Sequence, residues 1–337
     1  MALGLVVAWL GCRTTALPVE ELPATPIALR FRTIDEAERL AEARARNEKG
    51  PGSSRPGEQR AVVDLNALGE RMGVAAGAGE RLAATLGKVA LYHPRSGTLE
   101  VVEWAPRGTR PLAWSPDRQK LLFLMMQRGT TGIFEYDLEA ELLVPVVSSR
   151  RRHLAASYGP DGTIIFSRVD PVDRQGRGGV RLYLLDVATG RARPLTQGPA
   201  DSKPVVSAEG GFVIFEQRDA QGRARIARLD LQGPAEPKVL AMGQDPSVSP
   251  DGAWVVYAAP LRGYLRLWRM RPDGSAKQGI GPHRTGVMES DPHVSPDGRF
   301  VVFVSKELGR LRLMVRPLAG GPTWPLITEG EGLEPVW

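Results

Sequence analysis

The sequence Val248-Ser249-Pro250-Asp251-Gly252, followed closely by Trp254-Val255-Val256-Tyr257, decides the fold because versions of it recur along the chain. The other copies begin at Trp114, Tyr158, Val206 and Val294. The chain ends on Glu334-Pro335-Val336-Trp337, in which Trp337 stands at the first position of a sixth copy. The steps between successive copies are 44, 48, 42, 46 and 43 residues. So regular a period indicates a repeat architecture.

Each repeat contains a tight turn and several short strands. In the turn, Pro presets φ, Asp hydrogen-bonds the backbone ahead of it, and Gly accepts a positive φ. The run after the turn is continuously apolar, as in Phe300-Val301-Val302-Phe303, which is typical of a strand buried on both faces. An alternating third strand such as Leu265–Met270 leads through a hairpin such as Asp273-Gly274 to a short fourth strand. Four strands per repeat predict the blades of a β-propeller.

Five complete repeats and one composite unit predict a ring of six blades. Val89–Tyr92 and Leu99–Trp104 match the third and fourth strands of a blade, and Glu334–Trp337 would supply its inner strand. Pairing N- and C-terminal strands in one blade closes the ring and removes two open sheet edges. The second strand of this blade has no convincing candidate unless Ala61–Leu65 supplies it. The predicted fold is therefore an all-β, six-bladed propeller of four-stranded blades, preceded by a poorly structured or partly helical N-terminal segment.

Residues 1–12 are expected to form a signal peptide. The apolar stretch Ala2–Gly11 ends at Cys12, which is the only cysteine and therefore excludes an internal disulfide and a cysteine-rich zinc site. A small residue followed by cysteine at this place resembles a bacterial lipoprotein signal, which implies that Cys12 is lipidated. The alternative is a buried cysteine on a hydrophobic N-terminal strand.

Residues 13–87 are expected to form a tether. Leu17–Pro26 is interrupted by prolines, and Thr33-Ile34-Asp35-Glu36 predicts a capping box at the start of a short helix. Pro51–Gly57 has the composition of a flexible linker. The propeller is expected to span residues 88–337.

The net charge of +6 does not indicate a nucleic-acid surface. Arginines are spread along the chain, and Arg150-Arg151-Arg152 is the one tight run. Nucleic-acid footprints are usually clustered basic stripes with aromatic platforms. No apolar run reaches membrane-spanning length. We therefore expect no nucleic-acid partner, and contact with a membrane through a lipid anchor alone.

The Ser-Pro-Asp-Gly turns, the Pro-x-aromatic or Pro-x-Val segments before them and the trailing Leu-Thr resemble the TolB-like, WD-repeat-related propeller family. The resemblance covers about Val89 to Trp337. It departs at Arg118, which replaces the turn glycine of the first repeat, and at Ser207-Ala208-Glu209-Gly210 in the third. It implies a periplasmic, monomeric lipoprotein of the outer membrane that binds an envelope protein or peptide.

Motifs of catalysis are missing from the sequence. It contains no Gly-x-Ser-x-Gly, no His-Glu-x-x-His and no phosphate-binding loop. A non-catalytic protein without a cofactor is therefore expected. The alternatives are a lactonase- or cyclase-like propeller enzyme with a channel metal, and a carbohydrate binder that uses Trp254, Trp268 or Trp324 as stacking platforms.

Four charged residues stand immediately before the prolines of predicted inner strands: Lys203, Asp245, Asp291 and Glu334. Equivalent positions on inner strands form a ring around a propeller axis, so these side chains are expected at one mouth of the channel. Carboxylates this close would raise the pKa of at least one of them, or recruit a basic peptide segment or Ca²⁺. The alternative is that the acids cap turns and solvate the rim.

Overall fold

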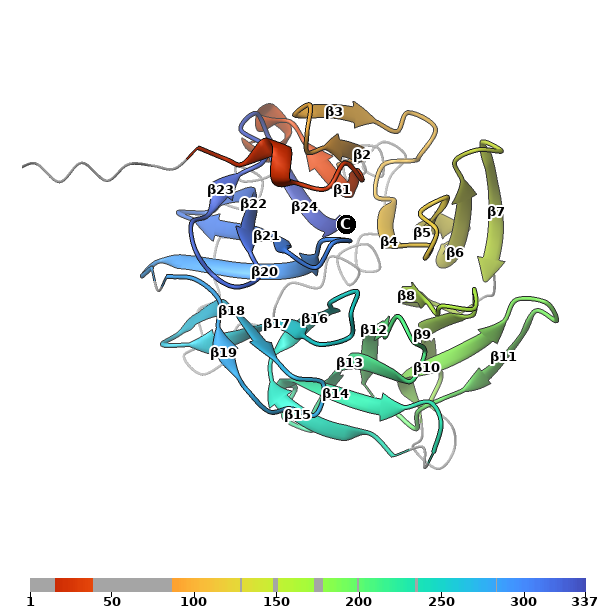
Figure 1. The fold of residues 1–337 in the computed structure, drawn as a ribbon. Helices are drawn as coiled ribbons and strands as arrows, with labels where there is room; N and C mark the ends of the chain where they lie inside the picture. Colours follow the sequence, from red (N-terminus) through yellow and green to blue (C-terminus); the bar gives the residue numbers. More distant parts are fainter. Residues whose placement is uncertain are drawn as a thin grey trace, which may run out of the picture.

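The computed structural model describes residues 16–38, 87–127, 129–147, 151–172, 178–198, 200–233, 236–282 and 284–337. Within them, six four-stranded antiparallel sheets are arranged as blades around one axis (Figure 1). The six-bladed propeller predicted from the repeat is confirmed. Cys12, the linker Pro51–Gly57 and the candidate strand Ala61–Leu65 lie outside the described residues.

Five blades are each built from four strands that are consecutive in the chain, with the first strand nearest the axis. Blade 1 contains β4 (Arg110–Trp114), β5 (Lys120–Gln127), β6 (Thr130–Asp137) and β7 (Leu142–Val147). Blade 2 contains β8 (His153–Tyr158), β9 (Ile164–Asp170), β10 (Gly179–Asp186) and β11 (Arg191–Pro194). Blade 3 contains β12 (Asp201–Val206), β13 (Phe212–Arg218), β14 (Ala224–Asp230) and β15 (Lys238–Met242). Blade 4 contains β16 (Gln244–Val248), β17 (Val255–Leu261), β18 (Tyr264–Met270) and β19 (Gln278–Gly279). Blade 5 contains β20 (Val287–Val294), β21 (Phe300–Glu307), β22 (Arg310–Pro317) and β23 (Trp324–Pro325).

Blade 6 joins strands from the two ends of the described chain, as predicted. From the axis outward it contains β24 (Glu331–Val336), β1 (Ile27–Arg32), β2 (Lys88–His93) and β3 (Thr98–Val101). In Figure 1 the red β1 lies beside the blue β24.

The second strand of blade 6 corrects the expected domain boundary. It is Ile27–Arg32, which the sequence analysis placed within the tether, so the propeller takes in residues well before residue 88. Ile27, Ala28 and Leu29 are fully buried, whereas the second half of the strand carries Arg30 and Arg32. This strand follows a proline-interrupted segment and has no Ser-Pro-Asp turn before it, which hid it from the repeat.

The segment around β1 is anchored on both sides. Before it, η1 (Val19–Glu21) leads to Leu22, which is fully buried against blades 5 and 6. After it, the predicted capping box is present: the Thr33 N–H donates to Glu36 Oε2 (3.2 Å), and the Glu36 N–H donates to Thr33 Oγ1 (3.3 Å). Residues 34–38 are helical. No helix in the described ranges is long and apolar enough to cross a membrane.

The core consists of six apolar clusters, each shared by two neighbouring blades. Second strands contribute residues to the clusters on both of their faces. In β17, for example, Val255 packs toward blade 3, whereas Val256 packs toward blade 5, and both are fully buried. This explains why the second strand of each repeat is continuously apolar.

Candidate functional site

Bulges within four inner strands position the predicted charged residues. Lys203, Asp245, Asp291 and Glu334, each together with the proline after it, oppose a single residue of the neighbouring strand. Two residues against one define a β-bulge, which accommodates the proline and redirects side chains. All four charged residues have left-handed backbone, with φ of 50°, 54°, 48° and 50°. Such strain costs about 1–3 kcal/mol per residue and is often found at functional sites.

These residues line one cavity of about 340 Å³ on the propeller axis. All six inner strands contribute to its wall, and β13 adds Glu216 and Arg218. The structure therefore brings the four predicted residues together. We call this cavity the channel mouth, and its charged residues are Arg110, Lys203, Glu216, Arg218, Asp245, Asp291 and Glu334.

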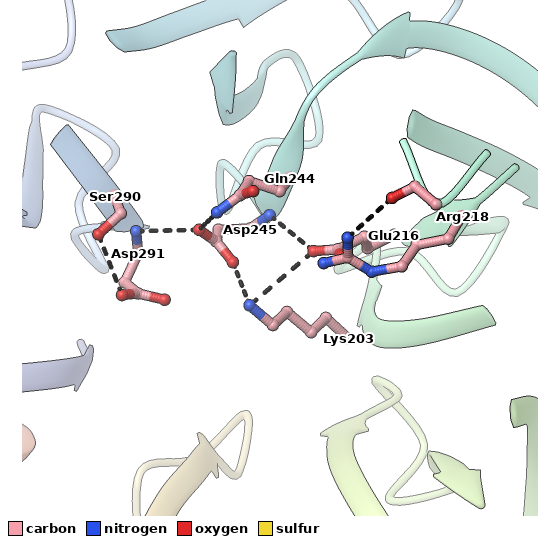
Figure 2. Close-up of polar contacts among 8 residues, drawn as sticks. Lys203, Glu216, Arg218, Gln244, Asp245, Ser290 and Asp291 are labelled. Carbon is pink, nitrogen blue, oxygen red and sulfur yellow. Dashed lines mark hydrogen bonds and ion pairs between the residues drawn. The ribbon is translucent and has the colours of Figure 1, made fainter. Parts of the chain in front are cut away.

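One side of the channel mouth holds an ion-pair network centred on Lys203 (Figure 2). The Lys203 ammonium pairs with Asp245 and lies 3.9 Å from Glu216 Oε2. Arg218 Nη2 donates to Glu216 Oε1 (2.8 Å), and Gln244 Nε2 donates to Asp245 Oδ2 (3.0 Å). The two carboxylates are deeply buried, whereas the Lys203 side chain, 41% exposed, faces the cavity. This network contains two cations and two carboxylates.

The network fixes the protonation of its members. Burial by itself would raise the pKa of Asp245, but the Lys203 ammonium outweighs this effect and holds that pKa below its usual value. Burial would also lower the pKa of Lys203, yet the charges of Asp245, Asp291 and Glu216 raise it above its usual value. Both side chains are therefore charged at neutral pH.

The other side of the channel mouth is built around Glu334. Its carboxylate lies 3.2 Å from Arg30 Nε and 3.0 Å from Arg110 Nε. Burial would raise the pKa of Glu334, but Arg110 and Arg30 together hold it below its usual value. Glu334 is therefore an ionised carboxylate held between two guanidinium groups.

Asp291 lies between the Lys203 network and the Glu334 ion pairs, and its carboxylate differs from Asp245 and Glu334 in its pairing. Ser290 Oγ donates to Asp291 Oδ2 (3.2 Å), and the Asp291 N–H donates to Asp245 Oδ2 (3.4 Å) (Figure 2). Within the described residues its carboxylate has no cation at ion-pair distance. Burial, followed by the negative charge of Asp245, raises the pKa of Asp291 to about 7. The sequence predicted a raised carboxylate pKa from like-charge repulsion; in the structure burial is the larger cause and the charge of Asp245 the second.

The channel mouth is less acidic than the sequence suggested. Reasoning from the sequence missed Arg30, Arg110 and Glu216, which pair with the predicted residues, and Arg218, which pairs with Glu216. Arg110 stands directly before Pro111 and could have been found by the same rule. The other three lie on second strands, in β1 and β13, where the repeat pattern gives no signal of their orientation.

The geometry does not favour the expected calcium site. Among the residues that the structure describes, no group of three or more His, Cys, Asp or Glu side chains could hold a metal ion. Lysine and arginine side chains already lie against the carboxylates of Asp245 and Glu334. The arrangement is therefore suited to a polar or charged organic group rather than to a bare cation.

Comparison with known proteins gives the same architecture. The family described as TolB beta propeller domain matches residues 86–288. The structure is similar to TolB from Acinetobacter baumannii, with 22% identity and a TM-score of 0.61 over 74% of this chain and 62% of that one. A TolB candidate from Agrobacterium tumefaciens has 23% identity and a TM-score of 0.58 over 71% of this chain and 88% of that one. Hydrazine synthase from Kuenenia stuttgartiensis is also similar, with 14% identity and a TM-score of 0.60 over 74% of this chain and 43% of that one. The chain thus spans less than two thirds of the Acinetobacter protein, and similarity at these identities shows the shared fold alone.

Proposed function

The chain belongs to the TolB β-propeller family, and we propose that it is a non-catalytic envelope protein that binds a protein or peptide at the channel mouth. The observation that carries this proposal is Asp291. It is a carboxylate in the channel wall that, among the residues the structure describes, lacks the cation its neighbours Asp245 and Glu334 each possess. We infer that the partner supplies this cation.

A basic group fits this place for electrostatic reasons. In the free protein, ionising Asp291 costs the desolvation of a buried charge and places a third negative charge near Asp245 and Glu334, and both effects raise its pKa. A lysine, arginine or terminal amine of the partner would stabilise the ionised form through a charge-assisted hydrogen bond. The surrounding Lys203 and Arg110 would disfavour a partner segment with several adjacent positive charges. The site therefore suits a segment with one basic group among neutral or acidic ones.

The proposed absence of catalysis rests on the pairing of the channel residues. In the described part of the chain, the acids of the channel mouth other than Asp291 are held by lysine or arginine. Such pairs are suited to recognition rather than to proton transfer, because the pKa values of Asp245 and Glu334 are held below their usual values and stay far from neutrality. Metal analysis of the purified protein tests the competing proposal of a metal-dependent propeller enzyme: a stoichiometric metal would support that alternative.

The location of the protein is a separate part of the proposal. We propose that it is a monomer in the periplasm, anchored to the outer membrane through a lipid on Cys12. The family and the lipoprotein-like sequence before Cys12 support this location. A Cys12→Ser variant should move from the membrane fraction to the soluble periplasmic fraction. Retention of the variant in the membrane would refute the anchor.

Binding at the channel mouth is tested by affinity capture from detergent-solubilised bacterial envelope. The baits are the full chain, Asp291→Asn and, as a control with the same loss of charge, Glu139→Gln on an exposed turn of blade 1. Asn keeps the shape of Asp291 but cannot pair with a cation. Loss of one buried charge pair typically costs 2–5 kcal/mol or more, so retention of the partner should fall by about tenfold or more.

The control separates this effect from a general change in charge. A partner that the wild type and Glu139→Gln retain, but Asp291→Asn loses, would support the proposal. Equal retention by all three baits would exclude Asp291 as the recognition residue.

A further inference from the structure

Arg118 has an unusual backbone conformation for its residue type. It occupies the turn position that is glycine in the other four complete blades, at Gly162, Gly210, Gly252 and Gly298. Its φ is 63°, close to the 66° to 78° of those glycines, and its N–H donates to the Ser115 carbonyl (2.9 Å) as in a regular copy of the turn. A side chain in this left-handed region is strained, whereas glycine is not. The strain indicates that the arginine side chain has a role of its own.

The side chain of Arg118 is partly buried and lacks a partner. Its Nη1 is buried without a hydrogen bond to any atom of the structure, and no ion pair joins Arg118 to a carboxylate in the described ranges. Burial lowers the pKa of its guanidinium. By contrast, Arg30 and Arg110 at the channel mouth share Glu334. An unpaired buried guanidinium is costly unless an anion reaches it.

The surroundings of Arg118 in the ring differ from those of two of these glycines. In blades 3 and 5 the turn glycine packs toward the turn proline of the preceding blade, Gly210 toward Pro160 and Gly298 toward Pro250. Blade 1 is preceded by blade 6, whose first two strands, β24 and β1, are not consecutive in the chain and so are not joined by a turn of this kind. Arg118 therefore stands in the complete blade whose preceding blade has no turn between its first two strands.

The positive charge of Arg118 also acts on His293. It lies on β20, lines the channel and accepts a hydrogen bond from the Trp337 N–H at Nδ1 (3.2 Å). Burial, and after it the positive charge of Arg118, lowers the pKa of His293 to about 4. The two side chains are therefore in electrostatic contact across the boundary between blades 5, 6 and 1.

We propose that Arg118 forms a binding site for an oxyanion, a carboxylate or a phosphate group, at the end of the axis where the Ser-Pro-Asp turns meet. The planar guanidinium fork recognises both groups through paired N–H donors. The buried Nη1 fixes the orientation of the fork while the partly exposed remainder of the residue stays accessible. This site is distinct from the channel mouth, and its failure would leave the proposed binding at Asp291 untouched.

The test follows the side-chain resonances of His293 by NMR while the full chain is titrated with inorganic phosphate or with acetate. Sodium chloride at matched ionic strength is the control, and His293→Gln assigns the resonance. Each anion that binds should shift the His293 signal saturably and raise its pKa, because it neutralises the charge of Arg118. Saturation by phosphate alone identifies a phosphate site, and saturation by acetate alone identifies a carboxylate site.

Two variants show whether Arg118 itself is responsible. Arg118→Gly restores the usual turn residue and should abolish the saturable shift without lowering Tm, since it removes strain and an unpaired donor. Arg118→Lys keeps the charge but not the fork, and should bind each anion more weakly than wild type. The proposal is overturned if neither anion gives a saturable shift, if Arg118→Gly retains it, or if Arg118→Gly lowers Tm substantially and Arg118→Lys binds as wild type does.

Discussion

At the scale of single residues, the channel mouth depends on charged side chains held on a strained backbone. Lys203, Asp245, Asp291 and Glu334 repeat the same bulge and the same left-handed φ. Three of them have partners of opposite charge, which keep them ionised. Asp291 alone has no ion-pair partner among the described residues, and burial and the charge of Asp245 raise its pKa, so its protonation is the property of the site most sensitive to pH near neutrality.

The raised pKa of Asp291 predicts how stability depends on pH. Its pKa in the folded protein is about 7, whereas an aspartate in an unfolded chain titrates near about 4. Between these values the folded protein binds more protons than the unfolded chain, so Asp291 makes stability fall as the pH rises through this window. Asp291→Asn removes this dependence and should therefore stabilise the protein more at about pH 8 than at about pH 5.

Urea unfolding of the wild type and Asp291→Asn at both pH values measures this difference. The channel groups that face Asp291 are Asp245, Glu334, Lys203 and Arg110, and they are the same in both proteins. Glu139→Gln, far from these groups in the sequence and exposed, should show no such dependence. An equal effect of Asp291→Asn at the two pH values would contradict the assignment.

Sequence reasoning reached this site only in part, for a physical reason. The charged residues before the prolines could be aligned because propeller symmetry places equivalent positions around one axis. Their partners could not, because Arg30 and Glu216 reach the axis from second strands whose pairing is set by tertiary contacts. The mouth was expected to be acidic because the sequence pattern counts carboxylates without these cations.

At the scale of elements, blade 6 shows how the ring is closed. β1 pairs with β24 on one side and β2 on the other, so a short N-terminal strand bridges the inner and outer halves of the blade. The five other blades were predictable because each repeats the same turn and strand order. β1 was not, because arginines interrupt its apolar run at Arg30 and Arg32, and the residues on its two sides in the sequence do not resemble the repeat.

The role of β1 in the core predicts a clear effect on stability. Leu29 is fully buried in the cluster between blades 5 and 6. Leu29→Ala should lower the free energy of unfolding by about 2–5 kcal/mol, through lost burial and the cavity that remains. Ile34→Ala, just beyond the strand and 50% exposed, should change it by less than about 0.5 kcal/mol.

Chemical denaturation of the full chain and of both variants measures these free energies. If Leu29→Ala were as harmless as Ile34→Ala, residues 27–32 would belong to a tether rather than to the propeller.

At the scale of the whole molecule, the ring of blades brings two different sets of charged residues together. The bulges of the inner strands carry the charges of the channel mouth, where Asp291 has no ion-pair partner among the described residues. The turns that follow the inner strands carry Arg118 in a left-handed conformation. Closure of the ring holds the last described residue in place. Trp337 is almost fully buried, its indole Nε1 donates to the Thr25 carbonyl (3.1 Å), and its backbone N–H donates to His293 Nδ1. A partner could thus be recognised by charge at either set of residues without any movement of the blades.

Carboxyl footprinting of the full chain, with and without the partner captured from the envelope, tests the central claim most directly. A water-soluble carbodiimide and an amine nucleophile label accessible carboxyl groups, and mass spectrometry locates the labels. Binding at the channel mouth predicts that the partner reduces labelling of Asp291 several-fold while labelling of Glu139, on the exposed turn of blade 1, stays unchanged. Unchanged labelling of Asp291, with protection confined to carboxylates of the outer strands, would contradict the account and place the partner on the rim of the propeller.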